Sequence, residues 1–259
     1  MVNLVTLSVR QKQILSYVQQ VHGVLSSSLL SDKFNVSVQT IRKDMNELSD
    51  KGLVRRVHGG ISLPSDNDNL SFSKRELENV AAKQGIAQSV VREIPKGCSI
   101  FLGIGTTPKQ VAHALLDHPG LTVVTNNINA ALTLSRNHNI EVYLAGGIVR
   151  PSDEDTVGET ATDFYRQFNI KIGIFGVGGL NTDQQGQLLD FTPDEASLTR
   201  AIISQSSQCW LVVDQSKLTR YAPIVSAQLN EIDRVFIDQA NQQLITLCHN
   251  NKVDLMIAN

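Results

Sequence analysis

The chain has 259 residues, of which 41% are hydrophobic and 19% are charged, and its formal net charge is −2. This length suits one large domain or a medium-sized domain with a small appendage, and the ordinary apolar share excludes disordered and collagen-like chains. No stretch approaches the ~20 apolar residues that span a bilayer, and the N-terminus lacks the features of a signal peptide. Three widely spaced cysteines, Cys98, Cys209 and Cys248, favour reduced thiols over a disulfide framework. We therefore expect a soluble, cytoplasmic protein.

The first fifty residues carry the pattern of three helices. Apolar side chains repeat at helical spacing, and serines stand where N-caps are needed, with Ser37 before the third segment. This third segment has Ile41, Met45 and Leu48 on its inner face. The predicted segments run from about 9 to 21, from 26–28 to 34 and from 38 to about 51. A short turn between the second and third helices predicts a helix-turn-helix.

Two short extended runs follow the third helix, with His58-Gly59-Gly60 at their bend, as in a hairpin wing. Residues 1–60 hold eight Lys and Arg against four Asp and Glu, whereas the remainder holds 15 against 21. A basic head on an acidic body is the asymmetry expected where a small module meets a polyanion. We assign a winged helix-turn-helix domain to residues 1–62.

The third helix presents polar side chains from its first turns, where a recognition helix meets base edges in the major groove. Gln and Arg side chains make bidentate contacts to bases, while hydroxyls and free N–H groups at a helix start suit phosphate. A small protein–protein module with solvated charges is the alternative. The expected DNA contacts are Ser37, Gln39, Thr40, Arg42, Lys43, Arg55, Arg56 and His58.

The run from Val36 to Leu48 (VSVQTIRKDMNEL), followed by Arg56 to Gly60 (RVHGG), resembles the N-terminal signature of the DeoR family of bacterial transcription regulators. The resemblance implies a winged helix-turn-helix that binds double-stranded operator DNA, usually as a repressor. Because operator reading generally needs two heads, we also expect a homodimer or homotetramer.

A polar segment from Pro64 to Ser73 (PSDNDNLSFS) predicts a linker, which we assign to residues 63–75, ahead of an α/β domain at 76–259. A long amphipathic helix is predicted from Glu76 to Ile94. Apolar runs then alternate with helical stretches, and such continuous runs are typical of parallel strands buried on both faces. The pattern predicts a doubly wound α/β fold. The predicted strands are Ser99–Ile104, Leu121–Thr125, Glu141–Ala145, Lys171–Val177, Cys209–Val213, Arg234–Ile237 and Val253–Ile257.

Small and polar residues follow these strands, at the edge where open α/β sheets bind ligands. After the first strand, Gly105-Thr106-Thr107-Pro108 opens a helix and suits a phosphate, because backbone N–H groups and the helix dipole favour an anion. This loop is neither a P-loop nor a dinucleotide fingerprint. Later strand ends carry Thr125-Asn126, Gly146-Gly147 with Arg150, Gly176 to Gly179, and Asp214 to Lys217. Together they favour a small anionic, hydroxylated ligand.

These strand ends, with Val157-Gly158-Glu159 and Glu195, are similar to the C-terminal sensor domain of the DeoR family. The resemblance implies a domain related to ribose-5-phosphate isomerase that binds a phosphorylated sugar or polyol, and it favours glycerol 3-phosphate. Many family members carry Asp two residues before the Gly-Thr-Thr, where this chain has Gly103. The expected effector contacts are Gly105, Thr106, Thr107, Thr125, Asn126, Gly146, Gly147, Arg150, Gly178, Glu195 and Lys217.

Two other functions stay open. One is a DeoR-type regulator whose effector is not glycerol 3-phosphate but a hexose, pentose or ketose phosphate. A more distant alternative is a sugar-phosphate isomerase with a DNA-binding head. Isomerisation needs a general base, and the loop after the fourth strand offers no carboxylate until Asp183. The His and Cys residues show no metal-ligand spacing. We therefore expect no catalysis, no metal and no cofactor.

Overall fold

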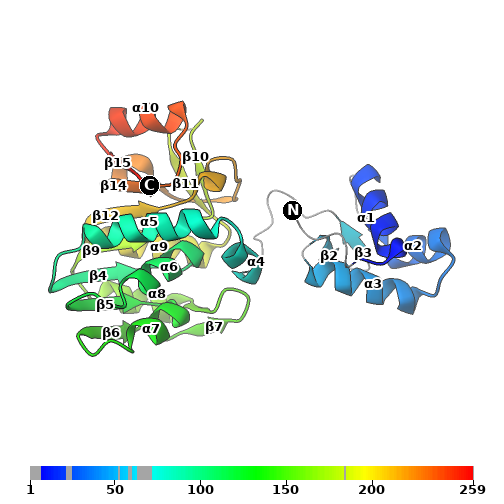
Figure 1. Cartoon of the computed structure of the whole chain (residues 1–259), viewed down its shortest axis with the longest axis horizontal. Coiled ribbons are helices and arrows are strands. Elements are labelled where there is room, and N and C mark those ends of the chain that lie inside the picture. The colour runs from blue at the N-terminus through cyan, green and yellow to red at the C-terminus, as the bar shows by residue number, and fades with distance from the viewer. Residues whose placement is uncertain are drawn as a thin grey trace. The chain divides into compact units, whose positions relative to one another are not determined.

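The computed structural model of the chain describes residues 7–21, 25–51, 53–57, 60–62, 72–183 and 185–258 (Figure 1). The chain divides into two compact units, Met1–Leu70 and Ser71–Asn259. Among the helices that the structure describes, none combines the length and the apolar character that a bilayer crossing requires.

Unit 1 contains the three predicted helices, α1 (Val9–Val21), α2 (Ser27–Phe34) and α3 (Val38–Asp50). The side chain of Ser26 accepts from the backbone N–H of Leu29 and caps α2, and Ser37 caps α3 in the same way through Thr40. Asn35 ends α2 in the left-handed conformation, with φ 49°, which makes the turn tight. The core of the unit consists of Leu7, Ile14, Val18, Leu25, Leu30, Ile41, Met45, Leu48, Val54 and Ile61.

The predicted wing is formed by β2 (Arg55–Val57) and β3 (Gly60–Ser62), which pair in antiparallel register. The predicted bend residues His58 and Gly59 lie outside the described residues. A third strand, β1 (Leu25–Ser26), pairs with the other edge of β3. Two residues are too few to show strand alternation in a sequence, so β1 was not predicted.

Unit 2 is built on seven parallel strands in the order β15-β14-β12-β9-β4-β5-β6. This confirms the predicted doubly wound sheet. Their bounds are β4 (Cys98–Leu102), β5 (Leu121–Thr125), β6 (Ile140–Leu144), β9 (Ile170–Phe175), β12 (Ser206–Val212), β14 (Arg234–Ile237) and β15 (Asp254–Ile257). Strand order reverses between β4 and β9, and the carboxyl ends at such a switch point form the usual ligand crevice.

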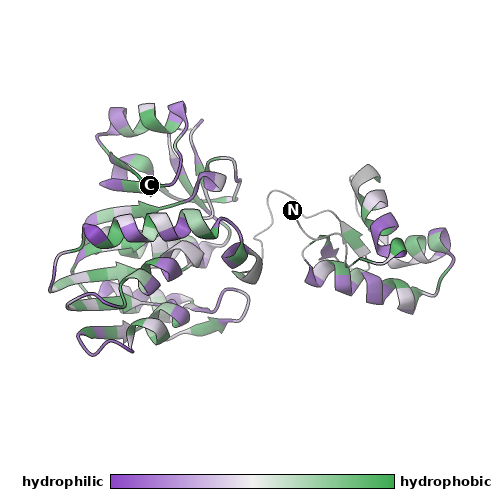
Figure 2. Cartoon of the chain, in the orientation of Figure 1, coloured by the Kyte–Doolittle hydropathy of each residue, from purple (hydrophilic) through white to green (hydrophobic). Residues whose placement is uncertain are grey.

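Helices cover both faces of this sheet. On one side pack α5 (Val80–Arg92), α6 (Thr106–Ala114) and α7 (Ile128–Leu134), and on the other α8 (Glu159–Arg166), α9 (Pro193–Ser204) and α10 (Gln242–Asn251). Alternate strand residues face opposite cores, as Ile100 and Leu102 do on one side and Phe101 on the other. Both faces of the inner strands are covered and these strands are mostly apolar, as the hydropathy colouring shows (Figure 2), whereas the edge strands β6 and β15 keep exposed residues.

Two small antiparallel sheets add to the main one. One joins β7 (Ile148–Arg150) to β8 (Asp155–Val157), and the other contains β10 (Gly179–Asn181), β11 (Gln187–Asp190) and β13 (Ile224–Gln228). These short strands were not predicted from the sequence. The first supplies Arg150, and the second begins just after the loop that follows β9.

The single helix predicted from Glu76 to Ile94 is wrong. The structure has two helices here, α4 (Phe72–Leu77) and α5, separated at Asn79, which adopts φ 51° in the left-handed region. Helix α4 begins inside the range assigned to the linker, of which residues 63–71 lie outside the described part of the chain.

The three cysteines are free and buried. Burial raises the pKa of the Cys209 thiol to about 12 and that of Cys248 to about 11. This confirms that the thiols are unpaired, and their raised pKa values make them poor nucleophiles near neutral pH.

Candidate recognition helix and effector site

Helix α3 has one apolar and one polar face. Ile41, Met45 and Leu48 are fully buried, whereas Gln39, Arg42, Lys43 and Asn46 are exposed. Arg42, Lys43 and Asn46 follow Gln39 by three, four and seven residues, so the four side chains lie on one side of the helix. Asn46 was not among the predicted DNA contacts, although this spacing would have found it.

The buried face of α3 also carries a carboxylate. Asp44 is 5% exposed, and its Oδ2 accepts from Nε of Arg10 at 2.5 Å. Gln11 donates through Nε2 to Glu47 Oε2 at 2.6 Å and, more weakly, to Asp44 Oδ1 at 3.4 Å. These contacts join α1 to α3 and fix the polar face of α3 relative to the rest of the unit.

The other predicted DNA contacts are distributed around α3 and the wing. Ser37 is exposed, and its hydroxyl lies 2.8 Å from that of Thr40 while capping the helix. Arg55 and Arg56 are exposed on β2. His58 lies outside the described residues. Cations and hydroxyls thus sit on the two elements with which a winged helix-turn-helix contacts a duplex.

In unit 2, the predicted phosphate loop connects β4 to the start of α6. Gly105 takes φ 111°, a left-handed conformation that glycine adopts readily, and no side chain caps the helix that follows it. Thr106 and Thr107 are 7% and 5% exposed, and their hydroxyls bond none of the described residues. The loop therefore presents helix-start N–H groups and two hydroxyls without an internal acceptor.

The loop after β9 meets this helix start at the switch point. A Cβ added at Gly176 would lie 3.5 Å from Cδ of Pro108 and 3.3 Å from the carbonyl oxygen of Val212, so the ends of β9 and β12 and the start of α6 converge. The backbone N–H of Gly178 donates to Asp190 Oδ1 at 3.1 Å. Burial, together with repulsion from Glu195, raises the pKa of Asp190 to about 6.

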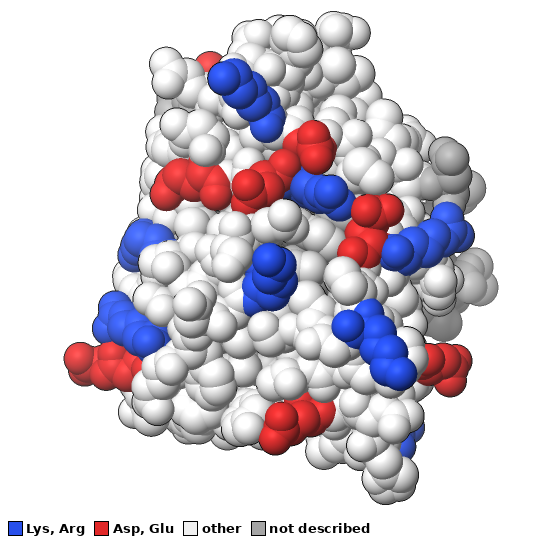
Figure 3. All heavy atoms as spheres, turned by 90° about the vertical axis from the view of Figure 1, so that its left-hand side faces the viewer, with Lys and Arg blue, Asp and Glu red and all other residues white. Residues whose placement is uncertain are grey.

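Lys217 lies in the short 3-10 helix η2 (Gln215–Leu218), which follows β12. Burial, with a smaller contribution from repulsion by Arg220, Arg75 and Lys83, lowers its pKa to about 7, while Asp214 opposes the shift. The ammonium makes no hydrogen bond or ion pair with the part of the chain that the structure describes. Four cations therefore act on one another here, and a bound anion would stabilise their charged forms. The left-hand side of Figure 1, by contrast, carries interspersed charges of both signs (Figure 3).

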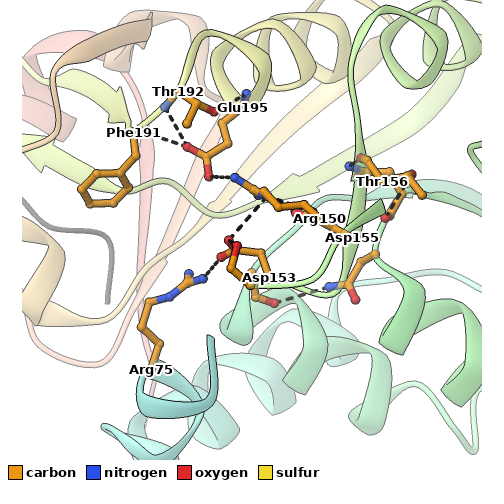
Figure 4. A network of polar contacts seen from close by, with 12 residues as sticks. Arg75, Arg150, Asp153, Asp155, Thr156, Phe191, Thr192 and Glu195 are labelled. Carbon is orange, nitrogen blue, oxygen red and sulfur yellow. Dashed lines mark hydrogen bonds and ion pairs between the residues drawn. The ribbon is translucent and has the colours of Figure 1, made fainter. Parts of the chain in front are cut away.

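Arg150 and Glu195 are the centre of an ion-pair network (Figure 4). Arg150 donates to both oxygens of Asp155, at 3.1 and 2.6 Å, and to Glu195 Oε1 at 2.6 Å. Although burial lowers the pKa of Arg150, these carboxylates raise it above its ordinary value. Glu195 Oε2 accepts from the backbone N–H groups of Phe191 and Thr192, both at 2.9 Å, so both residues are already paired within the protein.

The remaining predicted effector contacts hold the strand ends together. The hydroxyl of Thr125 donates to the carbonyl of Leu102 at 2.6 Å. The side chain of Asn126 donates to the carbonyl of Thr156 at 2.7 Å and accepts from the Tyr165 hydroxyl at 2.8 Å. Gly146 and Gly147 form the bend between β6 and β7.

Two domain families match the chain. Residues 78–239 match the DeoR C terminal sensor domain, and residues 10–67 match the DeoR-like helix-turn-helix domain. The chain belongs to the DeoR family. It is therefore a DNA-binding transcriptional regulator with a sensor domain, and the predicted fold and family are confirmed.

Several relatives of this DeoR-family chain are named as repressors. The glycerol-3-phosphate regulon repressor of Escherichia coli is 42% identical over 88% of this chain and 90% of that protein. The protein of the same name from Haemophilus influenzae is 38% identical over 97% of both. The HTH-type transcriptional repressor CsqR of Escherichia coli is 32% identical over 89% of this chain and 87% of its own length.

Similarity to solved structures is weaker. Ribose 5-phosphate isomerase A from Methanocaldococcus jannaschii is 14% identical, with a TM-score of 0.41, over 55% of this chain and 56% of that one. The assignment to the DeoR family rests on the sequence matches.

Two features of this DeoR-family sensor domain were not predicted from the sequence. Lys83 is 3% exposed and donates to the carbonyl oxygens of Arg75 and Glu78. Its position, four and seven residues before the buried Ala87 and Val90, was a signal that it lies on the inner face of its helix. A Cβ added at Gly103 would lie 3.0 Å from that of Phe175, so an aspartate at this position would require Phe175 to give way by a few tenths of an ångström.

Proposed function

We propose that this DeoR-family regulator is a repressor in the cytoplasm, and that a phosphorylated polyol or sugar, best represented by glycerol 3-phosphate, releases it from its operator. Relatives 42% and 38% identical carry the name glycerol-3-phosphate regulon repressor, which supports repression and the choice of glycerol 3-phosphate as the effector. The observation that carries the proposal is Lys217, a cation surrounded by other cations and with no partner among the described residues, in the sensor domain that contains the uncapped start of α6.

The phosphate is held, in this proposal, by Gly105, Thr106, Thr107 and Lys217. The first three supply N–H groups and hydroxyls at the positive end of a helix, and Lys217 supplies charge. Arg150 and Glu195 lie toward the hydroxyl-bearing part of the effector. The other predicted contacts shape the surrounding wall: Thr125, Asn126, Gly146, Gly147 and Gly178.

The DNA-binding part of the proposal assigns base contacts to Gln39, Arg42 and Lys43. Ser37, Thr40, Arg55, Arg56 and His58 then position the head on phosphates. Two heads are needed to read two operator half-sites, so we propose a homodimer or homotetramer, which light scattering on the full chain would show as twice or four times the mass of the chain.

The sensor domain acts as a binding module and not as an enzyme in this proposal. Isomerisation requires a carboxylate that reaches the substrate carbon, and the loop from Gly176 to Asn181 contains none. Asp190, whose pKa of about 6 would suit a general base, is buried and bonded to Gly178 and Thr199.

Thermal melting with a panel of phosphate esters tests the proposal. A ligand at about 100 times its dissociation constant stabilises a protein by about 2.7 kcal/mol, which is several degrees for a domain of this size. We expect glycerol 3-phosphate to raise the melting temperature of the wild-type chain but not of Lys217→Met. Lys171→Met, an exposed lysine at the amino end of β9, is the matched control and should respond like the wild type. A response to a hexose or pentose phosphate alone would replace the effector, and no response to any ester would contradict the sensor assignment.

A further inference from the structure

Helix α4 and the residues just after it contact three segments near the carboxyl ends of the strands. The backbone N–H of Phe72 donates to the carbonyl of Ser152, at 3.3 Å, in the turn between β7 and β8. Glu76 pairs with Lys109 of α6 at 2.7 Å. Just beyond α4, Asn79 donates to Asp214 at 3.0 Å, next to η2. Helix α4 thus contacts α6, and the segment after it contacts the residue before η2, the two elements that carry the proposed phosphate ligands.

Arg75 is the residue through which α4 joins the ion-pair network. Its guanidinium donates to Asp153, which also lies 3.4 Å from Arg150, and Arg150 in turn pairs with Glu195 (Figure 4). Burial lowers the pKa of Arg75, and its charge also repels that of Lys217. The carboxylate of Asp153 therefore attracts the guanidinium of Arg75, whereas the cations around Lys217 repel it.

We propose that α4 transmits effector binding to the DNA-binding head, and that Arg75 is its movable contact, shared between Asp153 and the anionic group of the effector. The inference rests on the proposed function, because it requires an anion beside Lys217. In the effector-free state Arg75 pairs with Asp153 and holds α4 in the position that the structure shows. A bound phosphate attracts Arg75, which weakens the pair with Asp153.

The chain itself makes the connection to the head. Helix α4 is the first element of unit 2, and it follows residues 63–71, which lead from the wing. A change in the position of α4 therefore acts directly on the segment that joins the two units. An effector shifts such an equilibrium only by its difference in affinity for the two states, and an anion that bonds Arg75 in one state supplies that difference.

Asp153→Asn tests this coupling in the full chain. The asparagine is nearly the same size but lacks the charge that holds Arg75, so it favours the effector-bound arrangement. We expect glycerol 3-phosphate to bind this variant at least about threefold more tightly, and operator DNA without effector to bind at least about threefold more weakly. The effect of glycerol 3-phosphate on operator affinity should shrink by the same factor, because linkage is reciprocal. A duplex selected in vitro with the wild-type chain serves as operator.

Opposite changes in the effector and operator affinities distinguish coupling from a general loss of folding. If Asp153 only stabilises the fold, its loss weakens both binding reactions or neither, and either outcome overturns the inference. Asp153→Glu, which keeps the charge, should restore wild-type behaviour. Asp163→Asn is the control, since it removes the carboxylate of an exposed ion pair with Arg166 on α8.

A second measurement needs no variant. Amide hydrogen exchange of residues 72–77 in the wild-type chain should change by at least about twofold when glycerol 3-phosphate is added, because α4 changes its contacts. Unchanged exchange, in a protein that calorimetry shows to bind the compound, would overturn the inference and leave the proposed function intact. Failure of the wild-type chain to bind it would instead contradict the proposed function, and the inference with it.

Discussion

The surroundings of Lys217 lower the pKa of its ammonium group to about 7. Burial is the main cause, and the positive charges of Arg220, Arg75 and Lys83 add to it. Because the pKa is about 7 in the folded protein and 10.5 ordinarily, the unfolded chain binds the extra proton between these values. Lys217 therefore costs stability at neutral pH, and it gains a charge partner only when an anion binds.

Effector affinity should fall as the pH rises from 7 to 9. A bound phosphate raises the pKa of Lys217, so binding takes up a proton, and it weakens where free Lys217 is already deprotonated. The second pKa of a phosphate ester, about 6, lies below this window and adds little. Calorimetry in buffers of different ionisation enthalpy would show the proton uptake. In Lys217→Met both the uptake and the pH dependence should disappear, and their persistence would exclude Lys217 from the site.

Asp190 should make stability depend on pH in the acid range. Its pKa is raised from 3.8 to about 6, so the folded state binds more protons between these values, and stability falls as the pH rises through them. Asp190→Asn lacks this ionisation. We expect its free energy of unfolding, relative to that of the wild type, to increase from pH 4 to pH 7, by up to about 3 kcal/mol for a shift of this size. Urea denaturation at several pH values measures it, and a constant difference would contradict the buried carboxylate.

Arg42 should contribute to operator recognition more than to general DNA affinity. It is exposed on the polar face of α3, and loss of a bidentate base contact costs about 1–3 kcal/mol. In a fluorescence anisotropy titration, Arg42→Ala should bind the operator roughly 5- to 150-fold more weakly, with a much smaller loss on random duplex. Binding of glycerol 3-phosphate should be unaffected. An operator affinity equal to that of the wild type would remove Arg42 from the recognition surface.

Sequence patterns predicted the helices and strands whose formation depends on local interactions. The inner face of α3 (Ile41, Met45 and Leu48) and the parallel strands followed from apolar spacing, and Ser37 followed from capping chemistry. The break at Asn79 did not, because apolar spacing continues across it. Asn79 bonds Asp214, 135 residues away, and no local pattern contains that contact.

Asn79 should tolerate glycine better than alanine. Both substitutions lose the bond to Asp214, but alanine must also adopt φ 51°, which costs about 1–2 kcal/mol for a residue with a Cβ. We therefore expect Asn79→Ala to be less stable than Asn79→Gly by about 1 kcal/mol in urea denaturation. Equal stabilities, or a more stable alanine variant, would mean that the break between α4 and α5 lies elsewhere.

For the whole molecule, the sequence predicted two functional regions but not how their charges are paired. Hydroxyls and glycines at strand ends predicted the uncapped helix start at Thr106 and Thr107, because such residues are common at helix starts and strand ends. Arg150 and Glu195 were expected to meet the effector, yet they bond each other across 45 residues. Ion pairing of this kind depends on tertiary contacts, and so did the connection of Arg75 to the site.

We propose that a phosphate ester in the sensor domain weakens operator binding by the helix-turn-helix domain. Titration of a fluorescent operator duplex with the full chain, with and without saturating glycerol 3-phosphate, measures this effect. We expect the compound to raise the operator dissociation constant at least about fivefold, within the usual range of allosteric coupling, and to leave binding to random duplex nearly unchanged. An operator dissociation constant that is unchanged or lowered by the compound, in a protein shown to bind it, would mean that the phosphate ester does not release the repressor.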